Sequence, residues 1–179
     1  RFVKPTIEDF FEGTDHAAVD RLDLHRYMGT WYEIARFDHR FERGLSEVTA
    51  TYTLMPDGTV RVENRGCKHK KPYDVCKTAE GRAKIPDPSQ PGKLKVSFFL
   101  SFYSDYYVLE LDQDEYNYAL IGSSSDKYLW ILSRAPILPE EIKKKLLDAA
   151  TRRGYDVKKL IWEEQREKKI MSVSYTHLR

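Results

Sequence analysis

Trp31 and Arg134 are the two residues whose types and spacing most directly suggest a shared role in this chain. Trp31 stands at the start of the first of about eight strand-like segments, and Arg134 stands at the end of the last. In an antiparallel up-and-down barrel the first and last strands are neighbours that run in opposite directions, so both residues lie at the same end. A guanidinium stacked on an indole contributes roughly 0.5–2 kcal/mol. We therefore predict that the pair closes one end of a barrel and leaves a single open mouth.

Cys67 and Cys76 are the two cysteines of the chain, and their spacing fits neither a zinc site nor a CxxC redox motif. A disulfide between them would close a short loop, contribute roughly 2–3 kcal/mol and indicate an oxidising compartment. Two free thiols in a cytosolic protein are the alternative. In that case Cys67 could act as a nucleophile, so an enzyme on a barrel scaffold stays open as a second hypothesis.

The other reactive side chains do not form a catalytic pattern. The five histidines are scattered without metal-ligand spacing, and Gly122-Ser123-Ser124-Ser125 is not a nucleophile elbow. The carboxylates are expected on solvent-facing surfaces. A histidine near the mouth, such as His39 or His69, leaves a haem or pigment carrier as a third hypothesis. We expect no catalytic residue, no metal and no cofactor.

The bulk composition indicates one globular domain of 179 residues, with 41% hydrophobic and 32% charged residues. The net charge of +2 argues against a nucleic-acid-binding protein, since these usually carry a strong basic excess. No apolar run reaches the roughly 18 residues of a transmembrane helix. We therefore expect neither a nucleic-acid partner nor a membrane span.

Alternating segments between turn signals predict an eight-stranded antiparallel up-and-down β-barrel, an all-β calyx. Pro56-Asp57-Gly58 marks a hairpin, and the prolines between 86 and 92 cannot continue a ladder. A helical pattern between Pro139 and Gly154 predicts one C-terminal α-helix, packed on the outside and followed by a short strand at about 157–163. The predicted strands cover about 30–37, 47–55, 59–67, 78–85, 93–100, 106–112, 116–122 and 127–134.

The chain divides into three parts along its length. Residues 1–28 are predicted to form an N-terminal arm across the barrel floor, and residues 29–165 the barrel with its helix. Residues 166–179 have no clear period and are predicted to be a tail that is disordered or foreign to the domain.

Strand alternation places a mostly apolar set of side chains inside the barrel. The small residues Ala50, Gly81 and Ala83 favour an interior with room for a ligand over a filled one. Phe37 and Phe41 are expected at the mouth. The predicted ligand-binding residues are Val48, Ala50, Tyr52, Val60, Val62, Val96, Phe98, Val108, Tyr128 and Trp130, together with these two phenylalanines.

Basic residues cluster in the segments predicted to surround the mouth, namely Lys68, Lys70, Lys71 and Arg43. Such a rim suits an amphiphile with an anionic head and an apolar tail. The same lysines equally fit a solvated loop with no ligand, and the sequence leaves both interpretations open.

Three segments at matching spacing resemble the lipocalin family. They are Gly29-Thr30-Trp31-Tyr32-Glu33-Ile34-Ala35-Arg36, then Phe41-Glu42-Arg43-Gly44, and Leu129-Trp130-Ile131-Leu132-Ser133-Arg134-Ala135-Pro136. The resemblance is to the bacterial lipocalin group of outer-membrane lipoproteins related to apolipoprotein D, and it covers about residues 19–165. Gly29, Trp31 and Arg134 are its structural signature.

The resemblance implies binding, storage or transport of fatty acids, lysophospholipids or similar small amphiphiles. It also implies a bacterial envelope location, periplasmic or at the outer membrane, with peripheral membrane association, and it is compatible with a homodimer. This chain shows no signal sequence and no cysteine before Cys67, so lipidation of the native protein stays open.

Overall fold

The computed structural model describes residues 13–99, 102–163 and 165. The predicted tail over 166–179 and the first twelve residues of the predicted arm lie outside them. The described strands are β1 (Gly29–Phe37), β2 (Ser46–Leu54), β3 (Val60–Lys68), β4 (Val75–Lys84), β5 (Lys93–Phe99), β6 (Phe102–Leu111), β7 (Tyr118–Gly122), β8 (Trp130–Ser133) and β9 (Leu160–Trp162). The helices are α2 (Leu24–Tyr27) and α3 (Glu140–Arg152), with a 3-10 turn, η1 (Val157–Lys159), before β9.

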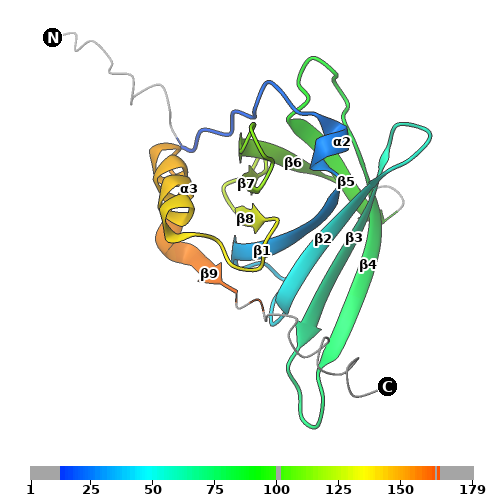
Figure 1. Ribbon diagram of the computed structural model, residues 1–179, viewed down its shortest axis with the longest axis vertical. Coiled ribbons are helices and arrows are strands. Elements are labelled where there is room, and N and C mark those ends of the chain that lie inside the picture. The colour runs from blue at the N-terminus through cyan, green and yellow to red at the C-terminus, as the bar shows by residue number, and fades with distance from the viewer. Residues whose placement is uncertain (1–12, 100–101, 164, 166–179) are drawn as a thin grey trace, which may run out of the picture.

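Antiparallel pairing closes the sheet into a barrel (Figure 1). Its order is β2-β3-β4-β5-β6-β7-β8-β1-β9, and an additional pairing of β1 with β2 completes the ring. The predicted eight-stranded antiparallel barrel with one outer helix and a short final strand is therefore confirmed. Most predicted strand boundaries hold to within a few residues. β6 is longer at its start than predicted, and β9 is shorter because η1 takes up its first residues.

The first strand changes partner along its length. β1 pairs with β2 over Gly29–Tyr32 and with β9 over Ala35–Phe37. Beyond Tyr32, the side chain of Gln165 bridges the two sides, because its Nε2 donates to the carbonyl oxygens of Glu33 at 2.8 Å and Val48 at 3.0 Å. We call this place, where β1 and β9 face the start of β2, the seam.

A bulge in β1 decides which side chains enter the barrel. Glu33 pairs with Leu132 of β8, whereas the next paired residues are Ala35 with Ile131 and Arg36 with Trp130. The extra residue shifts the alternation by one position. Arg36 therefore points inward, on the same face as Glu33.

Helix α3 covers the outer face of β1, β7 and β8 (Figure 1). Its Leu146 and Ala150 pack on Ile34, Leu120 and Ile131 in a core outside the barrel. The helix begins after Pro139 and ends before Gly154, whose φ of +97° only glycine adopts easily. Among the described residues, no helix has the length and apolar character that crossing a membrane requires.

Two predictions about interior positions are wrong. Phe37 packs in the outer core beneath α3, because the bulge in β1 turns it away from the mouth. Gly81 does not provide room for a ligand. A Cβ there would lie 2.5 Å from the carbonyl oxygen of Ser97 and 2.7 Å from the Phe98 ring, so the glycine permits close contact between β4 and β5.

Candidate functional site

The floor of the barrel is closed by Trp31 and Arg134. The Arg134 guanidinium carbon lies 3.8 Å from the centre of the Trp31 ring, as the spacing predicted. Arg134 also donates to the carbonyl oxygens of Arg26 at 2.7 Å, Tyr116 at 3.1 Å and Thr30 at 3.2 Å. The indole Nε1 donates to the Tyr27 carbonyl at 2.9 Å. These contacts tie α2, β1 and the chain after β8 into one plug.

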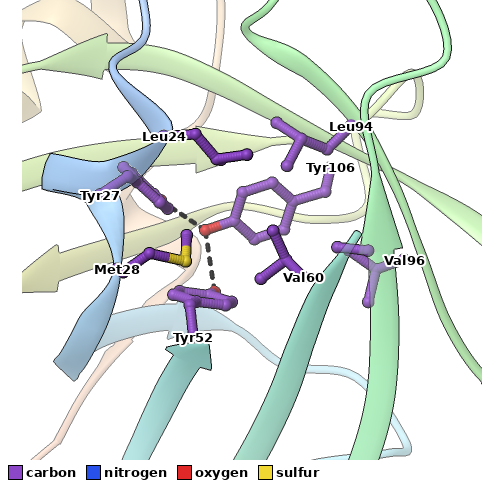
Figure 2. A pocket seen from close by; sticks show the side chains of 9 residues that line it. Leu24, Tyr27, Met28, Tyr52, Val60, Leu94, Val96 and Tyr106 are labelled. Atoms are coloured by element: carbon purple, nitrogen blue, oxygen red, sulfur yellow. Dashed lines mark hydrogen bonds between the residues drawn. The ribbon is translucent and has the colours of Figure 1, made fainter. Parts of the chain in front are cut away.

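A small apolar cavity lies above this plug (Figure 2). Its volume is about 10 Å³, which is room for about one water molecule. The Tyr106 hydroxyl lies 2.5 Å from that of Tyr27 and 2.9 Å from that of Tyr52, so the three phenols satisfy one another. Burial raises the pKa of all three. The floor end is therefore closed and well packed, and its three phenols are neutral.

The predicted lining residues of the barrel divide into two levels. Val60, Val62 and Val108 are fully buried near the floor, and Tyr52 is buried beside them. Val48 is buried against Gly66, whose added Cβ would lie 3.1 Å from it. The lining residues that stay partly exposed are Ala50, Val96, Phe98, Tyr128 and Trp130. That any of them contacts a ligand remains a prediction.

Aromatic rings from the start of β8, from the residues just before it and from the loop after β1 gather at the mouth. Tyr128 and Trp130 stack at 5.7 Å with an interplanar angle of 7°. The His39 ring meets both edge-on, at 5.6 Å from each. Phe41 lies next to His39 but is 63% exposed. The loop over 38–45 therefore packs its histidine against the inward-facing rings.

Beneath these rings lies a charged group that we call the mouth cluster: Glu33, Arg36, His39, Glu42 and Glu163. The Arg36 side chain is 4% exposed. Its Nη1 lies 2.8 Å from Glu163 and 3.9 Å from Glu33, and its Nε lies 3.5 Å from Glu42. Its Nη2 donates to the carbonyl oxygens of Glu42 at 2.9 Å and Leu45 at 3.0 Å. Arg36 thus fixes the loop after β1 to the barrel.

The mouth cluster holds more carboxyl groups than cationic groups. Burial, followed by the nearby charge of Glu42, raises the pKa of Glu33 well above its usual range. Burial also raises the pKa of Glu163 to about 8, against the opposing attraction of Arg36. Burial of Glu42 is outweighed by its close polar contacts with His39 and Glu33 and by the charge of Arg36, which hold its pKa below the usual range. Glu163 therefore keeps a proton at neutral pH, and burial favours the protonated form of Glu33.

The sequence pattern did not predict this cluster, because the carboxylates were expected only on solvent-facing surfaces. Glu33 could have been found, because it shares the inward parity of Trp31 on β1. The inward direction of Arg36 could not be predicted, because it depends on the bulge in β1. The place of Glu163 in the cluster depends on the pairing of β9 with β1, which brings together residues far apart in the chain.

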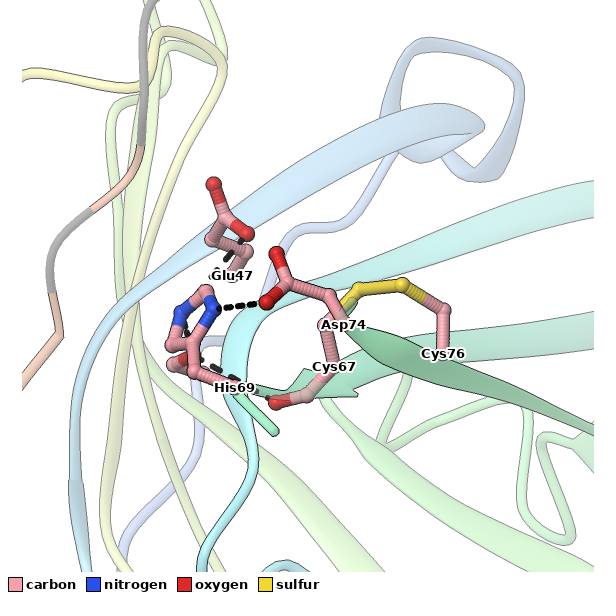
Figure 3. Close-up of a disulfide and its surroundings, with 6 residues drawn as sticks. Glu47, Cys67, His69, Asp74 and Cys76 are labelled. Carbon is pink, nitrogen blue, oxygen red and sulfur yellow. Dashed lines mark hydrogen bonds and ion pairs between the residues drawn. A yellow bond between two sulfur atoms is a disulfide. The ribbon is translucent and has the colours of Figure 1, made fainter. Parts of the chain in front are cut away.

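Cys67 and Cys76 face each other in the β3–β4 register and form the predicted disulfide (Figure 3). A bridged Cys67 has no thiol, so the hypothesis of a thiol-dependent enzyme is not supported. Among the described residues, Glu47, His69 and Asp74 are the group whose ligand atoms, within 4.8 Å of one another, lie close enough to hold a metal ion. His69 instead bridges polar neighbours, with Nδ1 at 3.0 Å from Asp74 and Nε2 at 2.8 Å from the Ser46 hydroxyl.

The predicted basic rim is only partly present. Lys70 and Lys71 are exposed in the turn between β3 and β4, and Lys68 is partly buried. The Arg43 guanidinium pairs with Asp38 at 3.1 Å, so its charge is largely balanced. The inward-facing titratable groups below the rim are mainly carboxyls, which the sequence pattern did not predict.

Comparison with known proteins agrees with this architecture. Residues 22–165 match the lipocalin-like domain family. The outer membrane lipoprotein Blc of Citrobacter freundii is 49% identical over 147 residues, which cover 82% of this chain and 81% of that protein. Apolipoprotein D of Mus musculus is 34% identical over 154 residues, covering 82% and 78%. Insecticyanin of the tobacco hornworm Manduca sexta superposes with a TM-score of 0.70 at 24% identity, over 87% of each chain. The chain therefore belongs to the lipocalin family, in the group of the bacterial outer membrane lipoproteins related to apolipoprotein D.

Proposed function

We propose that the protein binds a small hydrophobic or amphiphilic molecule whose apolar part enters the barrel. One observation carries this proposal. Ala50, Val96, Phe98 and Trp130 lie at inward-facing strand positions, yet they stay only partly buried. Partly exposed apolar side chains on a concave, closed scaffold are typical of a ligand site. Membership of the lipocalin family supports the same function, that of a carrier and not an enzyme.

The ligand class that fits is a single-chain amphiphile such as a fatty acid or a lysophospholipid, held for storage or transport. Burial of a tail contributes about 0.8 kcal/mol per methylene, so eight to ten methylenes give roughly 6–8 kcal/mol. The loss of translational and rotational freedom on association offsets several of these. The resulting affinity is expected to be micromolar.

The proposed location is the bacterial cell envelope. The relative from Citrobacter freundii is named an outer membrane lipoprotein. The Cys67–Cys76 disulfide suits an oxidising compartment such as the periplasm. Fractionation of cells that express the full-length native gene tests this location. Peripheral membrane association and a homodimer stay predictions, which vesicle sedimentation and sedimentation velocity test.

Native mass spectrometry of the purified protein, followed by organic extraction, tests the binding function. We expect a fatty acid or lysophospholipid in one-to-one ratio, or one-to-one binding of added oleate. Ala50→Phe should weaken oleate binding about tenfold by filling the interior. Thr53→Phe, on the outer face of the same strand, should leave it unchanged. A ligand-free protein that binds neither oleate nor lysophospholipid would overturn the proposal.

Haem or pigment carriage is the alternative that one observation favours. His39 lies in the mouth, and neither ring nitrogen makes an aligned hydrogen bond within the described part of the chain. Its Nε2 faces a Glu42 carboxyl oxygen at 3.4 Å, so that nitrogen already has a polar neighbour. We expect a colourless protein with no Soret band after addition of haem. A Soret band that His39→Ala abolishes would favour haem carriage over the amphiphile.

A further inference from the structure

β2, β3 and β4 form one curved wall of the barrel (Figure 1). The pairing of β3 with β4 runs without a bulge from Val60 and Ala83 to Lys68 and Val75, so the alternation of side chains is unbroken. Val60, Val62 and Ala83 are buried in the barrel interior. Every second residue from these positions toward the mouth therefore lies on the inner face of the wall. These residues are Asn64, Gly66 and Lys68 of β3 and Gly81, Ala79, Lys77 and Val75 of β4.

Asn64, Lys68 and Lys77 are the polar residues of this inward-facing set. Lys77 pairs with Gly66, which places it diagonally across from both Asn64 and Lys68. Diagonal neighbours in a sheet are about 7–8 Å apart, a distance that long side chains span. The three side chains are therefore able to contact one small group held between them.

Small residues flank the Asn64 amide on both sides. Asn64 is half-buried and pairs with Ala50 of β2 and with Ala79 of β4. Ala79 is exposed although it lies on the inner face, so the interior beside Asn64 is open. Tyr52 and Val62, one level nearer the floor, pair with each other and are buried. The wall is thus apolar below Asn64 and polar above it, which matches an amphiphile whose tail points toward the floor.

Among the described residues, none of these three polar side chains makes a hydrogen bond or an ion pair. The charged side chains on the outer face of the same strands do pair, since Arg61 lies 2.8 Å from Glu80 and 3.3 Å from Glu63. The inner face of the described strands therefore keeps two ammonium groups and one amide available for a ligand.

The chemistry of these groups favours an anion. An ammonium group only donates hydrogen bonds, and the Asn64 amide donates through its NH2 group. The oxygen atoms of a carboxylate or a phosphate accept such bonds, which are stronger when both groups are ionised. Across the seam, the mouth cluster holds mainly carboxyl groups around Arg36. An anionic head group is therefore favoured at the wall of β3 and β4 over the wall of β1.

A head group at this wall keeps its contact with water. Within the described strands, β4 pairs with β5 only from Arg82 to Lys84, so no strand pairs with β4 on that side of Lys77. Lys77 is accordingly exposed. A charged head group beside it loses little hydration, while the tail reaches apolar lining such as Ala50, the partner of Asn64.

We propose that Asn64, Lys68 and Lys77 bind the anionic head group of the amphiphile, a carboxylate or a phosphate, and we call them the inner-wall site. The inference rests on the proposed function, because the tail of the same molecule occupies the barrel. Of the basic residues that the sequence placed at the mouth, Lys68 belongs to the site, whereas Lys70 lies in the turn beyond β3. Lys77 joins the site because β4 begins earlier than predicted.

Two pairs of lipids test the site by tryptophan fluorescence titration at concentrations below aggregation. Oleate and oleyl alcohol share a chain and differ in a carboxylate. Oleoyl lysophosphatidylglycerol and monoolein share an acylglycerol and differ in a phosphate. We expect the anionic member to bind about tenfold more tightly in at least one pair, and that pair identifies the head group. Equal affinity within both pairs would overturn the inference.

Lysine variants locate the preference on the inner wall. Lys77→Gln should lower it about threefold, and Lys68→Gln combined with Lys77→Gln should abolish it while the affinity for the neutral lipids stays unchanged. Lys70→Gln removes the same charge from the exposed turn and should keep the preference. If Lys70→Gln lowers the preference as much as Lys77→Gln does, the effect is that of general rim charge and the inner-wall site is wrong.

Asn64→Asp tests the amide with almost no change of shape. The added carboxylate should repel the anionic head group and pair with Lys77, so the preference for the anionic lipid should disappear. Binding of monoolein or oleyl alcohol should persist, which shows that the barrel is still folded and open. An undiminished preference in this variant would remove Asn64 from the site.

The outcomes separate this inference from the proposed function. If no lipid of either pair binds, the proposed function fails and the inference fails with it. If the neutral lipids bind and the anionic lipids bind no more tightly, only the inference is overturned.

Lysine acetylation, measured by mass spectrometry, gives an independent readout. The preferred anionic lipid should slow the acetylation of Lys68 and Lys77 and leave that of Lys70 unchanged. Acetate and inorganic phosphate lack the tail, so they should protect Lys77 only above about 10 mM. Equal acetylation of Lys77 with and without lipid would contradict the site, and protection by micromolar phosphate would replace the amphiphile by a free anion.

Discussion

The two ends of the barrel interior differ in how well their polar groups are satisfied. At the floor, Arg134 stacks on Trp31 and donates to three carbonyl oxygens, and the three tyrosine hydroxyls bond to one another. At the mouth, Arg36 lies among three carboxyls, and several buried oxygens and nitrogens make no aligned hydrogen bond among the described residues. The floor therefore stabilises the fold, whereas the mouth keeps buried polar groups to which a ligand can form hydrogen bonds.

This contrast explains how one barrel can be both rigid and receptive. Arg134 and Trp31 find their stacking and hydrogen-bond partners within the protein, so the floor is expected to stay closed whether or not a ligand is bound. Buried polar groups at the mouth that lack aligned hydrogen bonds among the described residues cost free energy in the ligand-free protein. That cost is expected to fall when an amphiphile binds, which ties recognition to the open end.

Two tryptophans give the largest expected contrast. Trp31 is fully buried, so Trp31→Ala should lower the free energy of unfolding by about 3–5 kcal/mol. Trp130 is partly exposed in the mouth, so Trp130→Ala should lower it by only about 1 kcal/mol and should instead weaken oleate binding. Urea denaturation and fatty-acid titration measure the two effects. Equal losses of stability would remove the distinction between floor and mouth.

The mouth cluster should make stability depend on pH. The pKa of Glu163 is raised from 4.5 to about 8 in the folded protein, mainly by burial, and that of Glu33 is raised as well. Between these values the folded protein keeps protons that the unfolded chain has released, so the free energy of unfolding falls as pH rises. The expected fall from pH 4.5 to pH 8 is on the order of 3 kcal/mol, and Glu163→Gln should flatten it. Urea denaturation across this range measures the slope, and a slope unchanged in Glu163→Gln would contradict the assignment.

Loss of the disulfide should lower the free energy of unfolding less than Trp31→Ala does. It joins paired residues of β3 and β4 at the mouth end and closes a short loop. Replacing both Cys67 and Cys76 by Ser should lower the free energy of unfolding by about 2–3 kcal/mol, largely by freeing the unfolded chain. Reduction of the unmodified protein with dithiothreitol should cause a matching loss. If neither treatment changes stability, the bridge is not formed in solution.

The smallest effect is expected at the rim. Arg43 and Asp38 form an exposed ion pair, so Arg43→Gln should change the free energy of unfolding by at most about 1 kcal/mol. Arg134→Gln provides the matched control at the floor, where the lost stacking and hydrogen bonds should cost clearly more. A larger loss for Arg43→Gln than for Arg134→Gln would reverse the comparison.

Much of the fold follows from local pattern in the sequence. Alternation along β2, β3 and β5 predicts which side chains face inward, since side chains in a strand alternate with period two. The Pro139–Gly154 interval predicts α3 from its boundary residues. The Trp31–Arg134 contact follows from strand direction alone. The pairing of Cys67 with Cys76 follows less firmly, since the spacing also allows free thiols.

The sequence by itself therefore determined the barrel, its outer helix, the closed floor and most of the apolar lining. Only the tertiary structure decided the chemistry of the mouth. One extra residue in β1 turned Arg36 inward and Phe37 outward, and the pairing of β9 with β1 brought Glu163 to Arg36. The physical reason is range: alternation is a local property of the chain, whereas a bulge register and a buried ion pair depend on which distant strands meet.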